Sequence, residues 1–472
     1  MNEIMENNKL LVKQLMCLMT TNVNQMSDNL INNEIIEESI VYLKQSIEDY
    51  INSLSLQTSD CQYILLDDIY EDMDTKCEAI LDKMWETINC CDWSRVVVDI
   101  RYCFALVSLL KAFLKIWSTM SSNDRQFCLT QKLLALKALD FGLLMSPKLK
   151  DNILAKMAQI IHKDISDDQP YSDNCSDSLK RKLYANKKID FSTKRQNIIN
   201  DDNKEVIKDI IKLNDNECEL TSLLPYYKNI NKNQIQRVND IDFNTFCDQY
   251  LRPKLPVIVT DCMSDWPAMS CRKWSIDYIK RVAGYRTVPI EIGNKYTDEE
   301  WSQKLMTIND FIDKFIMNSW CKPVGYLAQH NLFDQIEELM ADISIPDFCS
   351  ITDEECVDVD INAWFGPKGT VSPLHYDPKD NIFAQMMGQK YIRLYSYETP
   401  REDIYPNDCR LLCNTSQVDL ENVDLQKFPN FNTLDNYYEC ILNEGEMLFM
   451  PKNYWHFVKS LSNCFSISFW WK

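Results

Sequence analysis

The chain has 472 residues, 45% of them apolar and 11% aromatic, and 70 acidic against 50 basic side chains give a formal net charge of −20. A chain of this length and composition can bury two or three cores, which excludes disorder throughout. The acidic balance disfavours direct binding to nucleic acid and suits basic partners such as Arg- and Lys-rich polypeptides. We therefore expect an ordered multi-domain protein that binds no nucleic acid directly.

The N-terminal residues lack the basic and apolar segments of a secretory signal. The most apolar stretch, 96–117, is interrupted by Asp99, Arg101, Lys111 and Lys115, which indicates a buried amphipathic helix and no membrane span. The 19 cysteines show no paired CxxC spacing, which is typical of reduced thiols. These features predict an intracellular protein without a membrane partner.

Glycine and proline are concentrated in the second half of the chain. Seven of the eight glycines follow residue 280, and thirteen of the sixteen prolines follow residue 250. Because both residues mark turns and strand ends, this asymmetry predicts a helical first part and a strand-rich second part. Helical patterns cover 31–55, 75–91, 94–118 and a run that begins at a cap on Asn123 or Asp124 and ends before Pro147. We expect an α-helical domain over 1–162 that binds a protein partner.

A polar segment follows at 163–205, with basic clusters at 180–182, 187–188 and 194–195. The simplest interpretation is a solvated linker, and a nuclear-import signal within it is compatible with that interpretation. We expect a nuclear location, with the cytoplasm as a second compartment. Residues 206–239 are expected to connect this linker to the next domain.

Short strand patterns bounded by Gly, Pro, Asn or Asp begin after about residue 240. They cover 256–260, 287–292, 357–366, 381–388, 389–396, 446–451 and 464–471. A helix is expected among them at 298–317. The fold class is therefore α+β, in which the helical domain precedes a sandwich or jelly-roll barrel over 240–472.

Two histidines and one aspartate form a candidate metal site in this second part. His375 and Asp377 are two residues apart, so on an extended strand both side chains point to the same face, and His456 follows 79 residues after Asp377. Two histidines and one carboxylate on one face of a metal are typical of non-haem Fe(II) oxygenases. The alternative is a fortuitous HxD pair. His330 is expected to be a hydrogen-bonded core or pocket residue and His162 to be structural.

Lys390 lies between apolar residues in a predicted strand, MMGQKYIRLYS. A buried lysine is costly unless a carboxylate neutralises it, and a dicarboxylate ligand would supply that charge. The alternative is a lysine on the outward face of an edge strand.

Three blocks of the sequence resemble the JmjC-type 2-oxoglutarate oxygenases. They are INAWFGPKGTVSPLHYDPKDNIFAQMMGQKYIRLYS, NTSQVDLENVDLQKFP and EGEMLFMPKNYWHFVKSLSNCFSISFWW. Within these enzymes the chain is most similar to the Jumonji domain-containing protein five group, described as arginyl hydroxylase, proposed lysine demethylase and proposed peptidase. The resemblance implies a double-stranded β-helix of the cupin type with flanking helices, Fe(II) as cofactor, and 2-oxoglutarate and O₂ as co-substrates.

The resemblance also implies roles for individual residues. The iron ligands would be His375, Asp377 and His456. The residues expected to hold 2-oxoglutarate are Tyr326, Ser372, Asn381 and Lys390, with Trp364 lining the same pocket. The residues expected on the substrate side are Glu291, Trp301 and Gln329.

The function implied is hydroxylation of arginyl residues in a basic protein, such as a histone, ribosomal or chromatin-associated protein. Segment 240–472 has 21 Lys and Arg against 35 Asp and Glu, which suits such a substrate. The alternatives are N-methyl-lysine demethylation of histones, a peptidase of histone tails, and a non-catalytic scaffold. Arginine is favoured if the carboxylate of Glu291 faces the metal, because a guanidinium binds a carboxylate and a methyl-ammonium binds an aromatic cage.

Overall fold

The computed structural model describes residues 63–90, 96, 98–119, 122–168, 234–293, 295–297, 301–318, 322–350, 358–410 and 412–472. The predicted helix at 31–55 and the three basic clusters lie outside these residues, as do most of the predicted linker and connecting segment. The import signal and the domain boundaries stay predictions.

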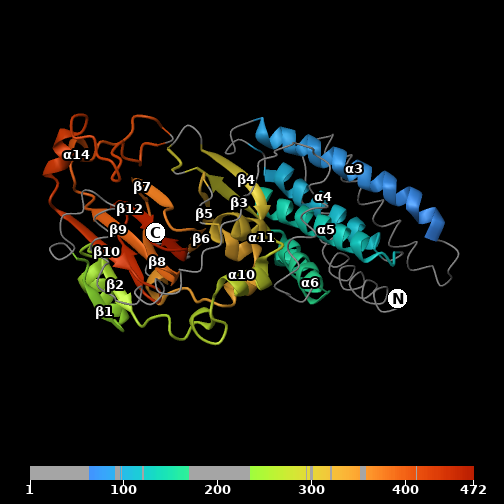
Figure 1. Cartoon of the computed structure of the whole chain (residues 1–472), viewed down its shortest axis with the longest axis horizontal. Helices are drawn as coiled ribbons and strands as arrows, with labels where there is room; N and C mark the ends of the chain where they lie inside the picture. The colour runs from blue at the N-terminus through green and yellow to red at the C-terminus, as the bar shows by residue number, and fades with distance from the viewer. Residues whose placement is uncertain are drawn as a thin grey trace, which may run out of the picture.

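In the described residues of the first part of the chain, four long helices pack side by side (Figure 1). They are α3 (Tyr63–Asn89), α4 (Val98–Trp117), α5 (Arg125–Met145) and α6 (Ile153–Asp168), with the short turn η3 (Lys150–Asn152) before α6. Asp124 caps α5 by accepting hydrogen bonds from the backbone N–H groups of Gln126 and Phe127, and α5 ends at Met145, as predicted. None of the described helices is both long and apolar enough to cross a membrane.

Two sheets form the second part. The nine-stranded sheet has the spatial order β1 (Arg237–Asn239), β2 (Val257–Thr260), β11 (Met447–Met450), β8 (Asp380–Met387), β13 (Cys464–Trp471), β6 (Asp360–Gly366), β5 (Gly325–His330), β3 (Thr287–Ile292) and β4 (Ser302–Thr307). The four-stranded sheet has the order β10 (Tyr437–Leu442), β9 (Lys390–Tyr395), β12 (Trp455–Ser460) and β7 (Val371–Tyr376). Apolar side chains from both sheets, such as Phe383 on β8 and Ile392 on β9, meet in one buried cluster. This confirms the predicted α+β jelly-roll architecture.

Short helices cover the outer face of the larger sheet. They are α9 (Phe243–Phe246), η4 (Cys247–Leu251), η5 (Pro267–Met269), α10 (Ile276–Ala283), α11 (Ile308–Phe311), η6 (Ile312–Ile316), α12 (Leu332–Gln335), α13 (Glu337–Met340) and η7 (Asp347–Ser350). Aromatic contacts hold them to the sheet, such as Phe311 against Phe365 at 5.3 Å between ring centroids. Two more, α14 (Arg401–Ile404) and η8 (Pro429–Thr433), pack in the apolar cluster outside the smaller sheet.

The predicted helix at 298–317 is wrong in its first half. Residues Ser302–Thr307 form strand β4, which pairs with β3 along its whole length. The chain becomes helical only at Ile308, where the Thr307 hydroxyl accepts a hydrogen bond from the Asp310 N–H. Pairing with β3 satisfies the backbone of this polar segment, and a single-sequence pattern does not reveal that pairing.

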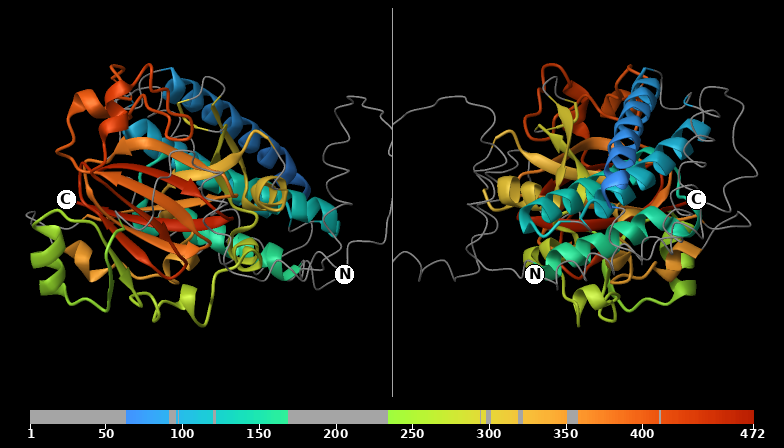
Figure 2. Two further views of the ribbon diagram at one scale, coloured as in Figure 1. Left: turned by 60° about the vertical axis from the view of Figure 1, so that its left-hand side comes forward. Right: turned by 90° about the vertical axis from the view of Figure 1, so that its right-hand side faces the viewer.

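The helices lie against the end of the barrel that β3 and β4 form (Figures 1 and 2). The junction centres on Asp140 of α5, whose side chain is fully buried. Its carboxylate accepts hydrogen bonds from the Arg286 guanidinium at 2.7 and 2.9 Å, the Thr287 N–H at 2.6 Å and the Gln335 amide at 2.8 Å. A buried ion pair is stable when such bonds satisfy its atoms. Asp140 therefore joins the helices to the start of β3.

We expect Asp140→Asn to lower the free energy of unfolding by about 3 to 5 kcal/mol, because it leaves the Arg286 guanidinium buried without a counter-charge. Denaturant unfolding followed by circular dichroism measures this change. Asp167→Asn, at an exposed position on α6, is the matched control and should change the value by less than about 0.5 kcal/mol. Equal effects of the two variants would contradict the assignment.

Candidate metal centre

Pairing between β7 and β12 brings the three predicted ligands together. His375 on β7 lies directly opposite His456 on β12, and Asp377 follows the end of β7. The Asp377 carboxylate oxygens are 3.8 Å from His375 Nε2 and 3.5 Å from His456 Nε2. The three ligand atoms lie within 4.8 Å of one another, and in the described part of the chain this is the one cluster with such spacing.

Both imidazoles are held with one nitrogen available for a metal. Nδ1 of His375 is 2.7 Å from the carbonyl oxygen of Pro373, and Nδ1 of His456 is 3.0 Å from that of Tyr454. Because a carbonyl oxygen only accepts, each Nδ1 donates a proton to it, and Nε2 is the atom of each ring that can bind a metal. Burial lowers the pKa of His456 to about 4, so this ring is neutral. Two imidazoles and a carboxylate fit Fe(II).

Lys390 points into the barrel, which rules out the outward-facing alternative. Its side chain is fully buried, and Nζ donates a hydrogen bond to the Tyr326 hydroxyl at 3.2 Å and lies over the Phe383 ring. No carboxylate of the described residues forms an ion pair with it, and burial lowers its pKa to about 8. A ligand carboxylate could therefore supply the counter-charge that this buried cation needs.

The other residues expected to hold 2-oxoglutarate surround the same space. Ser372 interacts with the Tyr326 hydroxyl, and the Trp364 ring lies 6.1 Å from the Tyr326 ring. The Trp364 indole N–H donates to the Ser468 hydroxyl at 3.0 Å. Asn381 is buried, and its Oδ1 has no hydrogen-bond partner. Such unsatisfied polar groups fit a polar ligand bound between the triad and Lys390.

Trp470 joins this set, although the sequence indicated only core packing for it. Trp471 packs in the core as predicted. Trp470 has the opposite orientation on β13, lies opposite Asn381 in the sheet, and has a buried indole N–H without a partner. Ser468 and Trp470 are two residues apart on β13, so their side chains point to the same face of the sheet. This alternation was the sequence signal that could have placed Trp470 in the pocket.

The candidate substrate residues differ in how far they are exposed to solvent. Glu291 is half-buried on β3 directly opposite Tyr326, and the Trp301 indole N–H donates to its carboxylate at 3.2 Å. Burial raises the pKa of Glu291. Gln329 is exposed, with a φ of 46°, at the irregular end of the β5–β6 pairing, and its substrate role stays a prediction.

Tyr296 is a site residue that the sequence did not reveal. Its ring is 6.4 Å from the His375 ring, and its hydroxyl is 3.1 Å from the Thr415 hydroxyl. Burial, with a smaller contribution from the nearby carboxylates of Asp377 and Glu291, raises its pKa to about 12. Tyr296 therefore lies between the triad and the candidate substrate carboxylate.

The remaining histidines have structural partners, as predicted. His330 Nε2 is 2.8 Å from the Gln335 amide oxygen, and His162 Nε2 is 3.0 Å from the carbonyl oxygen of Arg281.

Comparison with known proteins agrees with this geometry. The family described as "Cupin-like domain" matches residues 243–472. The chain is 39% identical over 428 residues to "Lysine-specific demethylase 8" of Danio rerio, covering 90% of this chain and 95% of that protein. The chain belongs to the JmjC family of 2-oxoglutarate oxygenases. The corresponding protein of Xenopus tropicalis is 35% identical, covering 92% and 96% of the two chains, and "Jumonji C domain-containing protein 5" of Drosophila melanogaster is 38% identical, covering 54% and 64%. JmjC enzymes in general depend on Fe(II) and 2-oxoglutarate.

We expect His375→Ala and Asp377→Ala to weaken binding of Fe(II), or of Co(II) as its redox-stable substitute, by more than about a hundredfold, because each removes a metal ligand. Anaerobic isothermal titration calorimetry measures the affinity. His162→Ala removes a histidine outside the cluster and should bind the metal like the parent protein. Tight binding by both ligand variants would exclude this site.

Replacing Lys390 by Met should have opposite effects on ligand binding and stability. We expect the Kd for 2-oxoglutarate to rise roughly a hundredfold, because the ligand carboxylate loses its buried counter-charge. The ligand-free protein should gain about 1 to 3 kcal/mol in free energy of unfolding, because a desolvated cation is removed. Calorimetry and denaturant unfolding measure the two quantities, with the exposed Lys273→Met as control. A loss of stability without a loss of affinity would contradict the ligand role.

Proposed function

We propose that this chain is an Fe(II)- and 2-oxoglutarate-dependent protein oxygenase that hydroxylates arginyl side chains. The observation that supports arginine is the half-buried Glu291 carboxylate, which lies opposite Tyr326 on the same side of the sheet. A planar guanidinium can bind such a carboxylate through two parallel hydrogen bonds. The neighbouring Trp301 and Tyr296 rings add faces for a cation–π contact.

Different residues of the chain would position the metal, the co-substrate and the substrate. Bound at the triad, Fe(II) with 2-oxoglutarate and O₂ supplies the oxidising power that converts a C–H bond to C–OH. His375, Asp377 and His456 would hold the metal on one side and leave the opposite positions open. Lys390 and Tyr326 would bind the far carboxylate of 2-oxoglutarate, and the Asn381 Nδ2 amide group and the Trp470 indole N–H would donate to its other end. Glu291 would orient the substrate, and the buried surroundings would exclude water.

A second candidate is demethylation of N-methyl-lysine. It is favoured by the names of the relatives, since those from Danio rerio and Xenopus tropicalis are called lysine-specific demethylases, as is "JMJ30" of Arabidopsis thaliana. The same oxidising centre would hydroxylate the N-methyl carbon, and the product loses formaldehyde. Both candidates require a basic substrate, which the net charge of −20 suits. We also infer that this protein acts in the nucleus, because its basic clusters at 180–182, 187–188 and 194–195 fit a nuclear-import signal.

Mass spectrometry of peptides incubated with the Fe(II)-loaded protein, 2-oxoglutarate and O₂ separates these reactions. We expect a gain of one oxygen atom on arginine in an arginine-containing peptide. Loss of a methyl group from methyl-lysine would favour demethylation, cleavage into two fragments would indicate a peptidase, and unchanged peptides would indicate a scaffold.

Glu291→Gln tests the basis for choosing arginine. The amide keeps the shape and loses the charge, so kcat/KM for an arginine peptide should fall roughly tenfold to a hundredfold while the affinity for 2-oxoglutarate stays the same. Steady-state kinetics and calorimetry measure the two quantities. An unchanged kcat/KM would refute the proposed guanidinium contact.

A further inference from the structure

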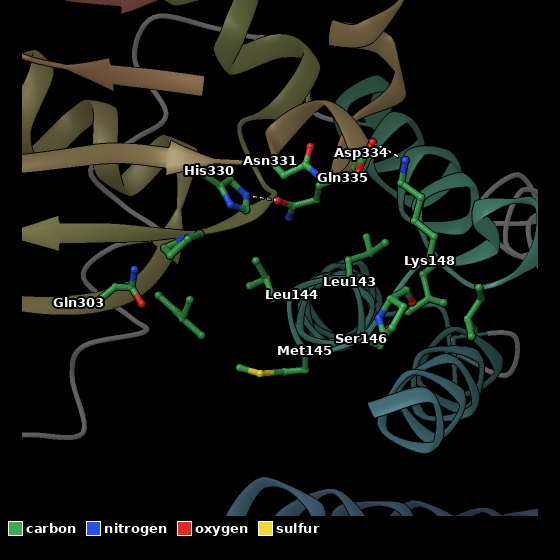
Figure 3. A pocket seen from close by; sticks show the side chains of 15 residues that line it. Leu143, Leu144, Met145, Ser146, Lys148, Gln303, His330, Asn331, Asp334 and Gln335 are labelled. Atoms are coloured by element: carbon green, nitrogen blue, oxygen red, sulfur yellow. Dashed lines mark hydrogen bonds and ion pairs between the residues drawn. The ribbon is translucent and has the colours of Figure 1, made fainter. Parts of the chain in front are cut away.

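A pocket of about 440 Å³ lies where the end of α5 meets strands β3, β4 and β5. Gln303 and His330 lie on one side of it, and Leu144 and Met145 lie across from them (Figure 3). Its walls are mainly apolar. The apolar lining residues are Leu143, Leu144, Met145, Pro147, Leu149, Leu154, Pro289 and Leu305.

The sheet register places one wall of this pocket next to the candidate substrate site. Glu291 on β3 lies directly opposite Tyr326 on β5 and Gln303 on β4, and directly opposed residues share one face. Pro289 and Leu305 form the next opposed pair on that face. Side chains two residues apart on a strand are separated by about 7 Å. The apolar floor of the pocket therefore begins about one such step from the Glu291 carboxylate.

The polar groups around the pocket add little net charge. Lys148 at the rim forms an ion pair with Asp334. Burial lowers the pKa of His330, which keeps its ring neutral. Gln303 is exposed, lies opposite Glu291 and lines the pocket, so its amide can form a hydrogen bond with a peptide backbone. A charged side chain would find no free counter-charge among these lining groups, whereas an apolar side chain would be desolvated favourably.

The pocket is held open by the junction between helices and barrel. His330 is fixed by its hydrogen bond to Gln335, and Gln335 in turn donates to Asp140 and to the Thr287 carbonyl. One buried hydrogen-bond network therefore joins the α5 side of the pocket to its β-sheet side. A preformed pocket of this kind costs little ordering when a ligand binds.

We propose that this pocket is a specificity subsite that binds an apolar side chain of the substrate polypeptide, two or four residues from the residue that is oxidised. In an extended peptide, side chains two or four residues apart point to the same side, so the target can enter the metal site while its neighbour enters the pocket. The occupant is a Leu, Ile, Met or Phe side chain. The assignment rests on the proposed function, because the target residue is anchored at Glu291.

The test uses the full chain and fluorescence anisotropy with labelled peptides. Each peptide has a central arginine in an alanine background, and a single leucine is moved from position −4 to position +4. We expect one or two of these positions to bind about tenfold or more tightly than the all-alanine peptide. Leu305→Gln and Leu144→Gln should each abolish this gain and leave the affinity for the all-alanine peptide unchanged. Lys304→Gln, an exposed residue on the opposite face of β4, is the control and should keep the gain.

Two results would overturn the subsite. One is equal affinity for leucine at every position. The other is an equal weakening of all peptides, including the all-alanine peptide, by Leu305→Gln and Leu144→Gln, which would show a structural effect. Oxidation of the same peptides is followed by mass spectrometry. A leucine preference without any oxidised product would contradict the proposed function and leave the pocket assignment standing, whereas oxidation without a leucine preference would contradict the pocket alone.

Discussion

The pairing of β7 with β12 is the constraint on which the site depends. It sets His375 opposite His456, and a slip of one residue would turn one of these ligands to the other face of the sheet. β12 also pairs with β9, which places Lys390 opposite Ser460 at the far end of the same ladder. The two ladders on β12 thus fix the distance between the metal ligands and the buried cation.

Two buried charges in this chain have opposite surroundings. Asp140 is satisfied by Arg286 and by two further donors, so its charge is neutralised within the protein. Lys390 has one tyrosine hydroxyl and two aromatic rings as neighbours. The first arrangement stabilises the fold, whereas the second leaves a charge to be matched by a ligand, at a cost to the ligand-free protein.

Much of the fold could be predicted from the sequence, because alternation and the positions of Gly and Pro are local signals. The same alternation paired His375 with Asp377. The residues expected to hold 2-oxoglutarate followed only from the family resemblance, since spacing left the orientation of Lys390 open. Strand β4 was missed because its stability comes from β3, and Tyr296 was missed because its place near His375 arises from tertiary packing. The junction at Asp140 had one sequence signal, a lone acid in the apolar run LALKALDFGLLM.

The Asp140 junction has a consequence for modularity. Separating the helices from the barrel would leave Arg286 without its partner and would expose Tyr285, which packs against the helical core. We therefore expect the two parts to unfold together as one cooperative unit, and the barrel to be destabilised when the helices are removed. We expect insertions and deletions between the helices and the barrel to be tolerated only where they leave the contact between Asp140 and Arg286 intact.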